Sequence, residues 1–329
     1  MVGLTRLRAA GLAVLVLGGA AAAAGAGLGR GAPARQIPST PAVFATVSGG
    51  LSIELRSVPN GGVVSRLGDV GGSWTNNGFA FSPNGRYVFF TLIPKRSKGS
   101  SLLLEQLSVS THRRRFIAFG EQPAVSPDAR RLAYVSGEDR TADVVVRDLA
   151  SGRRRSINLS RLLGGKTDML NASLAWLGDG TQLAVLEACC AVAVSTTSKA
   201  LGDGAKLIVV SVPAHGSLSA RHVAMPAGAE MPNTVGTDPT RPDSVLVSWP
   251  IAGDRDAVDR LTIASSRATL GRVVAVAHSL VVAFDPGRRK LLYLFGHTRP
   301  DLWAATFEGH RLEQRHLVIR NPSLDAYAW

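Results

Sequence analysis

A short motif recurs along the chain, and it constrains the fold more than any other feature of the sequence. Its clearest copies, in residues 78–90 and 123–134, join an apolar stretch, a Ser-Pro turn with Asn or Asp, and a second, more apolar stretch. In such a turn Pro presets φ, and Gly, Asn or Asp accepts the positive φ that follows. Each copy therefore predicts a tight β-hairpin. Less regular copies occupy residues 174–185, 237–248 and 282–293.

A second hairpin is predicted further along several of these units, for example in residues 51–64 and 144–157. Four strands joined by short turns make one blade of a β-propeller. The spacing supports this interpretation, because successive turns are 44 to 61 residues apart and WD-repeat blades need about 40–45 residues plus loops. The residues that mark the turns are Pro83, Pro127, Gly178, Pro239 and Pro286.

The two ends of the chain decide the number of blades. Residues 41–69 hold three predicted strands and lack an innermost one, whereas Asp325–Trp329 look like the start of a further repeat. We therefore predict that the C-terminal strand pairs into the first blade and closes the ring. The expected fold is all-β, a six-bladed β-propeller of four-stranded antiparallel blades.

The motif of residues 78–90 and 123–134 resembles the propeller repeats of the TolB family of exported bacterial proteins, and the resemblance covers residues 41–329. It implies an exported propeller that binds another molecule. TolB itself has an additional α/β domain before the propeller, for which residues 37–41 leave no room. The resemblance therefore extends to the propeller part only.

The N-terminal segment has the pattern of an export signal. Arg6 and Arg8 precede an uncharged stretch over residues 9–29, and small residues follow. We expect residues 1–36 to be a signal peptide, or an N-terminal membrane anchor with a short linker, because the uncharged stretch can just span a bilayer. Residues 37–329 are then the propeller domain. The expected location is extracytoplasmic: secreted, periplasmic, or anchored to the outer face of the cytoplasmic membrane.

The net charge of +13 favours anionic partners. Export argues against nucleic acid, so we expect a protein or an anionic envelope polymer, bound by a monomer. The runs Arg113–Arg115 and Arg153–Arg155 fall in predicted outer hairpins. They are interpreted as a charged outer edge, which discourages pairing with other sheets; the alternative is a rim that binds anionic polymer or acidic protein.

Motifs of known enzyme classes are missing from the sequence. It contains no G-x-S-x-G nucleophile elbow, H-E-x-x-H zinc motif, P-loop or G-x-G-x-x-G fingerprint. Its seven His are scattered, without the close spacing typical of zinc sites. We therefore predict no catalytic, cofactor-binding or metal-binding residue. The alternative that stays open is a lactonase- or lyase-like enzyme with its site at the mouth of the central channel.

The adjacent pair Cys189 and Cys190 is the most unusual local feature. Two Cys outside the cytoplasm tend to pair, yet adjacent residues can join only in a strained ring. A vicinal disulfide would stiffen the surrounding loop. The alternative is two buried thiols at the end of a strand.

Long loops are predicted on one face of the propeller and tight turns on the other. The long loops are residues 69–77, 93–101, 159–172, 187–205, 224–232 and 250–257. Because long loops on a rigid scaffold usually carry function, we predict a binding surface here, rich in Trp and basic residues. Its candidate residues are Trp74, Lys95, Arg96, Lys98, Lys166, Asp168 and Arg255. The predicted function is an exported, non-enzymatic binding or scaffold module.

Overall fold

The computed structural model describes most of the predicted propeller. The described residues are 43–48, 52–69, 73–93, 102–136, 142–162, 172–187, 206–226, 234–238, 240–251, 255–277, 279–285, 290–296, 300–308, 311–322 and 324–328. The predicted signal peptide or anchor, residues 1–36, lies outside them.

Twenty-four strands form six separate four-stranded antiparallel sheets, which we number as blades 1 to 6. Blade 1 holds β24 (Leu324–Ala328), β1 (Val43–Ser48), β2 (Ser52–Ser57) and β3 (Val63–Asp69). Blade 2 holds β4 (Ser73–Phe81), β5 (Tyr87–Ile93), β6 (Leu103–Ser108) and β7 (Arg114–Phe119). Blade 3 holds β8 (Glu121–Val125), β9 (Arg131–Ser136), β10 (Asp143–Asp148) and β11 (Arg154–Asn158).

The second half of the chain repeats this arrangement. Blade 4 holds β12 (Ala172–Trp176), β13 (Gln182–Glu187), β14 (Lys206–Ser211) and β15 (Ser219–Val223). Blade 5 holds β16 (Thr234–Thr237), β17 (Ser244–Ile251), β18 (Arg255–Ile263) and β19 (Ala268–Ala277). Blade 6 holds β20 (Ser279–Asp285), β21 (Lys290–Phe295), β22 (Asp301–Glu308) and β23 (Arg311–Ile319). Among the described residues, helix is limited to the single turn α1 (Leu159–Leu162).

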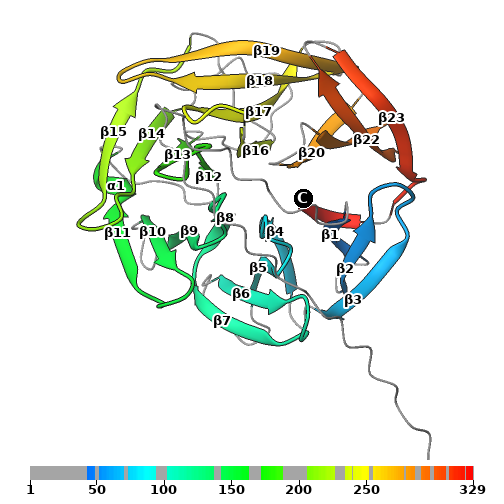
Figure 1. Cartoon of the computed structure of the whole chain (residues 1–329), viewed down its shortest axis with the longest axis horizontal. Helices are drawn as coiled ribbons and strands as arrows, with labels where there is room; N and C mark the ends of the chain where they lie inside the picture. Colours follow the sequence, from blue (N-terminus) through cyan, green and yellow to red (C-terminus); the bar gives the residue numbers. More distant parts are fainter. Residues whose placement is uncertain are drawn as a thin grey trace, which may run out of the picture. The chain divides into compact units, whose positions relative to one another are not determined.

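The blades surround a central axis, as Figure 1 shows, with the first strand of each sheet innermost. The innermost strands contact one another in the order β4, β8, β12, β16, β20 and β24, and β24 contacts β4. The prediction of an all-β, six-bladed propeller is confirmed.

The last described strand belongs to the first blade. β24 pairs antiparallel with β1, in a register that sets Ala45 opposite Ala328 and Val47 opposite Ala326. The sheet order places β24 innermost and β3 outermost in this blade. That this pairing holds the ring shut in solution stays a prediction.

The core lies between the blades. Buried apolar residues form six clusters, and each cluster joins two neighbouring blades. The second strand of a blade has neighbours on both faces, so it is a continuous buried run that is mostly apolar, as in Val88–Leu92 of β5. Trp176, Phe89 and Phe44 are among the largest fully buried side chains, and burying a large apolar side chain contributes about 1.5–3 kcal/mol.

The recurring turn is explained by its own hydrogen bonds. In blade 2, Ser82 Oγ accepts hydrogen bonds from the backbone N–H of Arg86 at 3.1 Å and Tyr87 at 2.8 Å. The same hydroxyl donates to Asn84 Oδ1 at 2.8 Å. Blade 3 repeats this pattern, since Ser126 Oγ donates to Asp128 Oδ1 and accepts from Arg131 N. The Ser and the Asn or Asp of the motif therefore close the turn between the first two strands.

Candidate functional site

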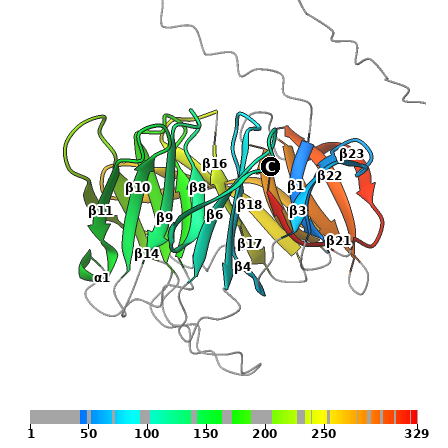
Figure 2. The same ribbon diagram turned by 90° about the horizontal axis from the view of Figure 1, so that it is seen from below.

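The propeller has two faces of different construction. Turns between strands one and two, and between strands three and four, lie on one face, which we call the turn face. Connections between strands two and three, and from each blade to the next, lie on the other, which we call the loop face. In Figure 2, α1 marks the loop face, because it follows the last strand of blade 3.

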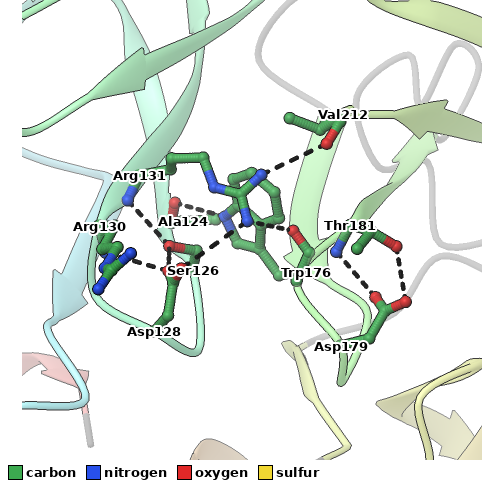
Figure 3. Close-up of polar contacts among 10 residues, drawn as sticks. Ala124, Ser126, Asp128, Arg130, Arg131, Trp176, Asp179, Thr181 and Val212 are labelled. Atoms are coloured by element: carbon green, nitrogen blue, oxygen red, sulfur yellow. Dashed lines mark hydrogen bonds and ion pairs between the residues drawn. The ribbon is translucent and has the colours of Figure 1, made fainter. Parts of the chain in front are cut away.

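On the turn face, Arg131 joins blade 3 to blade 4 (Figure 3). Its guanidinium lies 4.9 Å from the ring centre of Trp176. It donates to the carbonyl of Gly180 at 2.6 Å and to that of Val212 at 3.4 Å. Trp176 Nε1 donates in turn to the carbonyl of Ala124 at 2.9 Å. This arginine therefore has a structural role between the blades.

Other polar groups of the turn face are engaged in the same way. Asp238 is buried, accepts from Thr240 N at 2.9 Å, and forms an ion pair with Arg260 at 2.5 Å. Arg155 of blade 3 donates to the carbonyls of Pro213 at 2.7 Å and Gly216 at 3.1 Å in blade 4. The run Arg153–Arg155 is therefore only partly a free charged edge, since Arg155 supports a neighbouring hairpin.

The loop face carries exposed apolar side chains at the ends of strands. Ile93 ends β5, Leu280 lies near the start of β20, and Phe295 ends β21. All three are exposed. Phe295 also makes an edge-to-face contact with Trp303, with ring centres 6.4 Å apart. Exposed apolar side chains mark candidate interaction surfaces. Val63 and Val64, at the start of β3 on the turn face, are exposed as well.

Buried polar atoms without a hydrogen-bond partner also concentrate towards the loop face. Among the described residues, six buried side-chain atoms have no partner, and four of them lie in strand halves nearest this face. These four are Thr91 Oγ1, Ser248 Oγ, Trp249 Nε1 and Trp303 Nε1. Because native proteins leave few such groups unpaired, each one needs an explanation such as water or a bound molecule.

Irregular pairing marks one arc of the ring of innermost strands. In blades 6, 1, 2 and 3, a register shift interrupts the pairing of the innermost strand with its neighbour. The innermost strands β12 and β16 pair without such a shift. Gln122, inside the shift of β8, has a positive φ of 55°. Bulges and strained residues occur often beside functional sites.

The described residues include two of the seven residues predicted at the binding surface. Trp74 lies in β4, paired with Leu92, and Arg255 starts β18, paired with Ile251. They belong to blades 2 and 5, which lie on opposite sides of the ring (Figure 1). The other five lie outside the described residues: Lys95, Arg96, Lys98, Lys166 and Asp168. Cys189 and Cys190, the predicted vicinal disulfide, also lie outside them.

The exposure of three apolar residues on the loop face could not be predicted from the sequence. Ile93 and Phe295 are the last residues of apolar strands, and nothing in their local sequence separates them from the buried residues before them. Leu280 precedes a bulge, whose position depends on pairing with the neighbouring strand. To predict the exposure of these three residues, one would need to know where each strand leaves the sheet.

The described residues contain neither a metal-binding cluster nor a membrane-spanning helix. That part of the chain holds no group of three or more His, Cys, Asp or Glu able to bind a metal ion. It also contains no helix of the length and apolarity that a membrane crossing requires.

Asp148 and Tyr293 are among the groups whose pKa values are shifted for local reasons. Hydrogen bonds from the backbone and side chain of Ser151 lower the pKa of Asp148 in the turn between β10 and β11. Burial raises the pKa of the Tyr293 hydroxyl in β21. The shift of Asp148 results from hydrogen bonds within a turn, and the shift of Tyr293 results from burial in the core. Neither shift indicates a reactive centre.

Fold and faces together define a six-bladed β-propeller, and several solved structures are similar to this chain. TolB from Acinetobacter baumannii is 11% identical with a TM-score of 0.61, over 87% of this chain and 65% of the TolB chain. A chain of a nidogen/laminin complex is 12% identical with a TM-score of 0.55, over 87% and 96%. A functionally unknown protein from Desulfotomaculum acetoxidans is 13% identical with a TM-score of 0.50, over 86% and 83%.

The resemblance to TolB repeats is therefore confirmed at the level of the propeller fold. This chain spans about two thirds of the length of the TolB chain. No protein-family model matches the sequence. No curated protein matches it either.

Proposed function

We propose that this protein is an exported, non-enzymatic binding module that holds a protein or an anionic envelope polymer on its loop face. The contrast between the two faces is the observation that carries this proposal. On the turn face, arginines and carboxylates such as Arg131 and Asp238 are engaged in turns and blade contacts. On the loop face, apolar side chains such as Leu280 and Phe295 are exposed.

The similar structures support a binding role. The nidogen/laminin structure was solved as a complex, so that propeller-containing assembly has a protein partner. Export belongs to the same proposal, with residues 1–36 as its signal peptide or anchor and residues 9–29 as a possible tether. The net charge of +13 favours an anionic ligand by long-range attraction.

Charge reversal on the loop face tests the proposal. The triple variant Lys95→Glu, Arg96→Glu, Lys98→Glu should bind purified anionic envelope polymer, or a captured partner, more weakly and with less dependence on salt. The matched control reverses three exposed charges of the turn-face side, Arg130, Arg153 and Arg154.

We expect the control to bind like the wild type and both variants to fold. Melting temperatures verify the folding. Binding that survives the loop reversal and fails in the control would assign the ligand to the turn-face side and refute the proposal.

A second candidate, an enzyme with its site at the channel mouth, rests on the bulged innermost strands and the strained Gln122. Bulges often redirect side chains towards a reaction centre. Lactone hydrolysis and lyase assays on the purified full chain test this candidate. Glu121 is a buried carboxylate at the register shift of β8, next to Gln122. Turnover that is lost in Glu121→Gln without a change in melting temperature would favour the enzyme over the binding module.

A further inference from the structure

Two aromatic rings on the outer edge of blade 2 are exposed together. Phe116 and Phe119 of β7 expose 50% and 42% of their surface. Their ring centres lie 5.3 Å apart at an interplanar angle of 65°, an edge-to-face contact. Exposed Phe pairs are uncommon on monomer surfaces, and aromatic residues are enriched in protein interfaces.

A bulge in β7 creates this pair. Phe116 lies opposite Glu105 and Ala118 opposite Leu104, so Ile117 is an extra residue in the strand. In an unbroken strand, residues three apart point to opposite faces. The extra residue turns both Ile117 and Ala118 inward, where they are buried against blade 3, and leaves Phe116 and Phe119 together on the other side.

Blade 3 holds this bulge in place. Arg147 of β10 donates from Nη1 to the carbonyl of Ile117 at 2.9 Å. Ser136 Oγ donates to the carbonyl of Phe119 at 3.1 Å. These two bonds occupy carbonyls of the outer strand, so a partner that adds a further strand to β7 would have to displace them. The patch is therefore suited to contacts with side chains.

The start of β7, next to the two rings in sequence, is basic. Arg114 lies 5.4 Å from the ring centre of Phe90, donates from Nε to Glu105 at 2.8 Å, and donates to the carbonyl of Asp69 at 2.9 Å. Arg114 therefore neutralises Glu105. Arg113 and Arg115 on either side of it are exposed, and they leave an excess of positive charge at the start of β7. Strand alternation directs Arg115 to the face opposite Phe116, so this charge lies across the outer edge of β7 from the two rings.

We propose that Phe116 and Phe119 form a second interaction surface, which binds an acidic protein segment carrying an apolar side chain. The apolar side chain packs on the two rings, and the carboxylates of the segment reach Arg113 and Arg115 across the exposed outer edge of β7. A symmetric contact between two copies of this chain is disfavoured, because it would bring the same arginines together. This surface is separate from the loop-face site and does not depend on it.

Fluorescence anisotropy with a labelled peptide tests the proposal on the full chain. The probe is a short synthetic peptide in which aspartates flank one Leu-Trp pair. Two control peptides replace the Leu-Trp pair by Ser-Ser or the aspartates by lysines. We expect the probe to bind and both control peptides to bind at least about tenfold more weakly, since loss of a hot-spot contact has effects of that size.

The key variant is Phe116→Ser with Phe119→Ser, and the matched control is Val63→Ser with Val64→Ser. Val63 and Val64 are 44% and 59% exposed on the outer strand of blade 1. We expect the Phe variant to lose binding by at least about tenfold and the Val variant to keep it. The double variant Phe116→Leu with Phe119→Leu keeps an apolar surface. Its affinity for the probe should lie between those of the wild type and the Ser variant, which separates loss of recognition from misfolding.

Arg113→Glu with Arg115→Glu should weaken binding of the probe and reduce its dependence on salt. The reversal of Lys95, Arg96 and Lys98 should leave it unchanged, so failure here is distinguishable from failure of the loop-face proposal. A wild type that does not bind the probe, or a Phe variant that binds equally well, would overturn the proposal. Two further results would overturn it if the peptide does not bind. One is a dimer that depends on these two Phe, and the other is binding to anionic phospholipid vesicles that depends on them.

Discussion

The bridge from Arg131 to blade 4 predicts a specific loss of stability. Arg131→Met keeps most of the apolar stem but removes the guanidinium from the ring of Trp176 and from the carbonyls of Gly180 and Val212. The cation–π contact contributes about 0.5–2 kcal/mol. A hydrogen bond from a charged donor contributes about 1.5–3 kcal/mol. Since the side chain is only 18% exposed, we expect a total loss of about 2–4 kcal/mol.

The adjacent arginine provides the control. Arg130 is exposed, so Arg130→Met should change the free energy of unfolding by no more than about 0.5 kcal/mol. Urea denaturation followed by far-UV circular dichroism measures both variants. A double-mutant cycle with Trp176→Phe then isolates the contact between the two side chains, and we expect a coupling of about 0.5–1 kcal/mol. Equal losses in Arg131→Met and Arg130→Met would refute the bridge as a source of stability.

Three further predictions concern closure, a turn and a carboxylate. Deleting residues 322–329 should abolish cooperative unfolding, because β24 pairs with β1, and a truncated chain with an unchanged melting temperature would contradict ring closure. Ala129 has φ 55° where blade 2 has Gly85 at 69°, so Ala129→Gly should stabilise the protein by about 1 kcal/mol in urea denaturation. Asp148 has a lowered pKa, so its contribution is present at neutral pH and lost in acid. The destabilisation by Asp148→Asn should therefore shrink as pH falls below about 4.

The repeat could be predicted from sequence because its turn depends on neighbouring residues. Ser126, Asp128 and Arg131 make their hydrogen bonds within five residues of one another, so a short sequence pattern is enough to specify them. The number of blades followed from counting these turns and from the unpaired first blade. Because these turns are short and have a recognisable sequence, the face that carries them could be distinguished from the face with longer connections.

Contacts between blades could not be predicted in this way. Arg131 and Gly180 are 49 residues apart, and the sequence does not indicate which of many arginines will cross to the next blade. The exposure of Phe116 and Phe119 escaped prediction for a related reason. Their stretch reads Arg-Arg-Phe-Ile-Ala-Phe, a run without alternation, and only the position of the bulge decides which two residues face outward.

The separation of stability from function leads to a last prediction, on the loop between β5 and β6. Leu92 is paired with Leu103, so Ile93 and Leu102 are next in register and can be joined by the two residues of a tight hairpin turn. Replacing residues 94–101 by Asn-Gly supplies the turn that suits the twist of antiparallel strands. Core clusters and turn-face bridges remain intact in this variant, so we expect its melting temperature to stay within a few degrees of the wild type. It also lacks Lys95, Arg96 and Lys98, so it should lose the anionic ligand of the loop face while still binding the acidic peptide at Phe116 and Phe119. A variant that melts normally and keeps the anionic ligand would show that this loop has no part in binding.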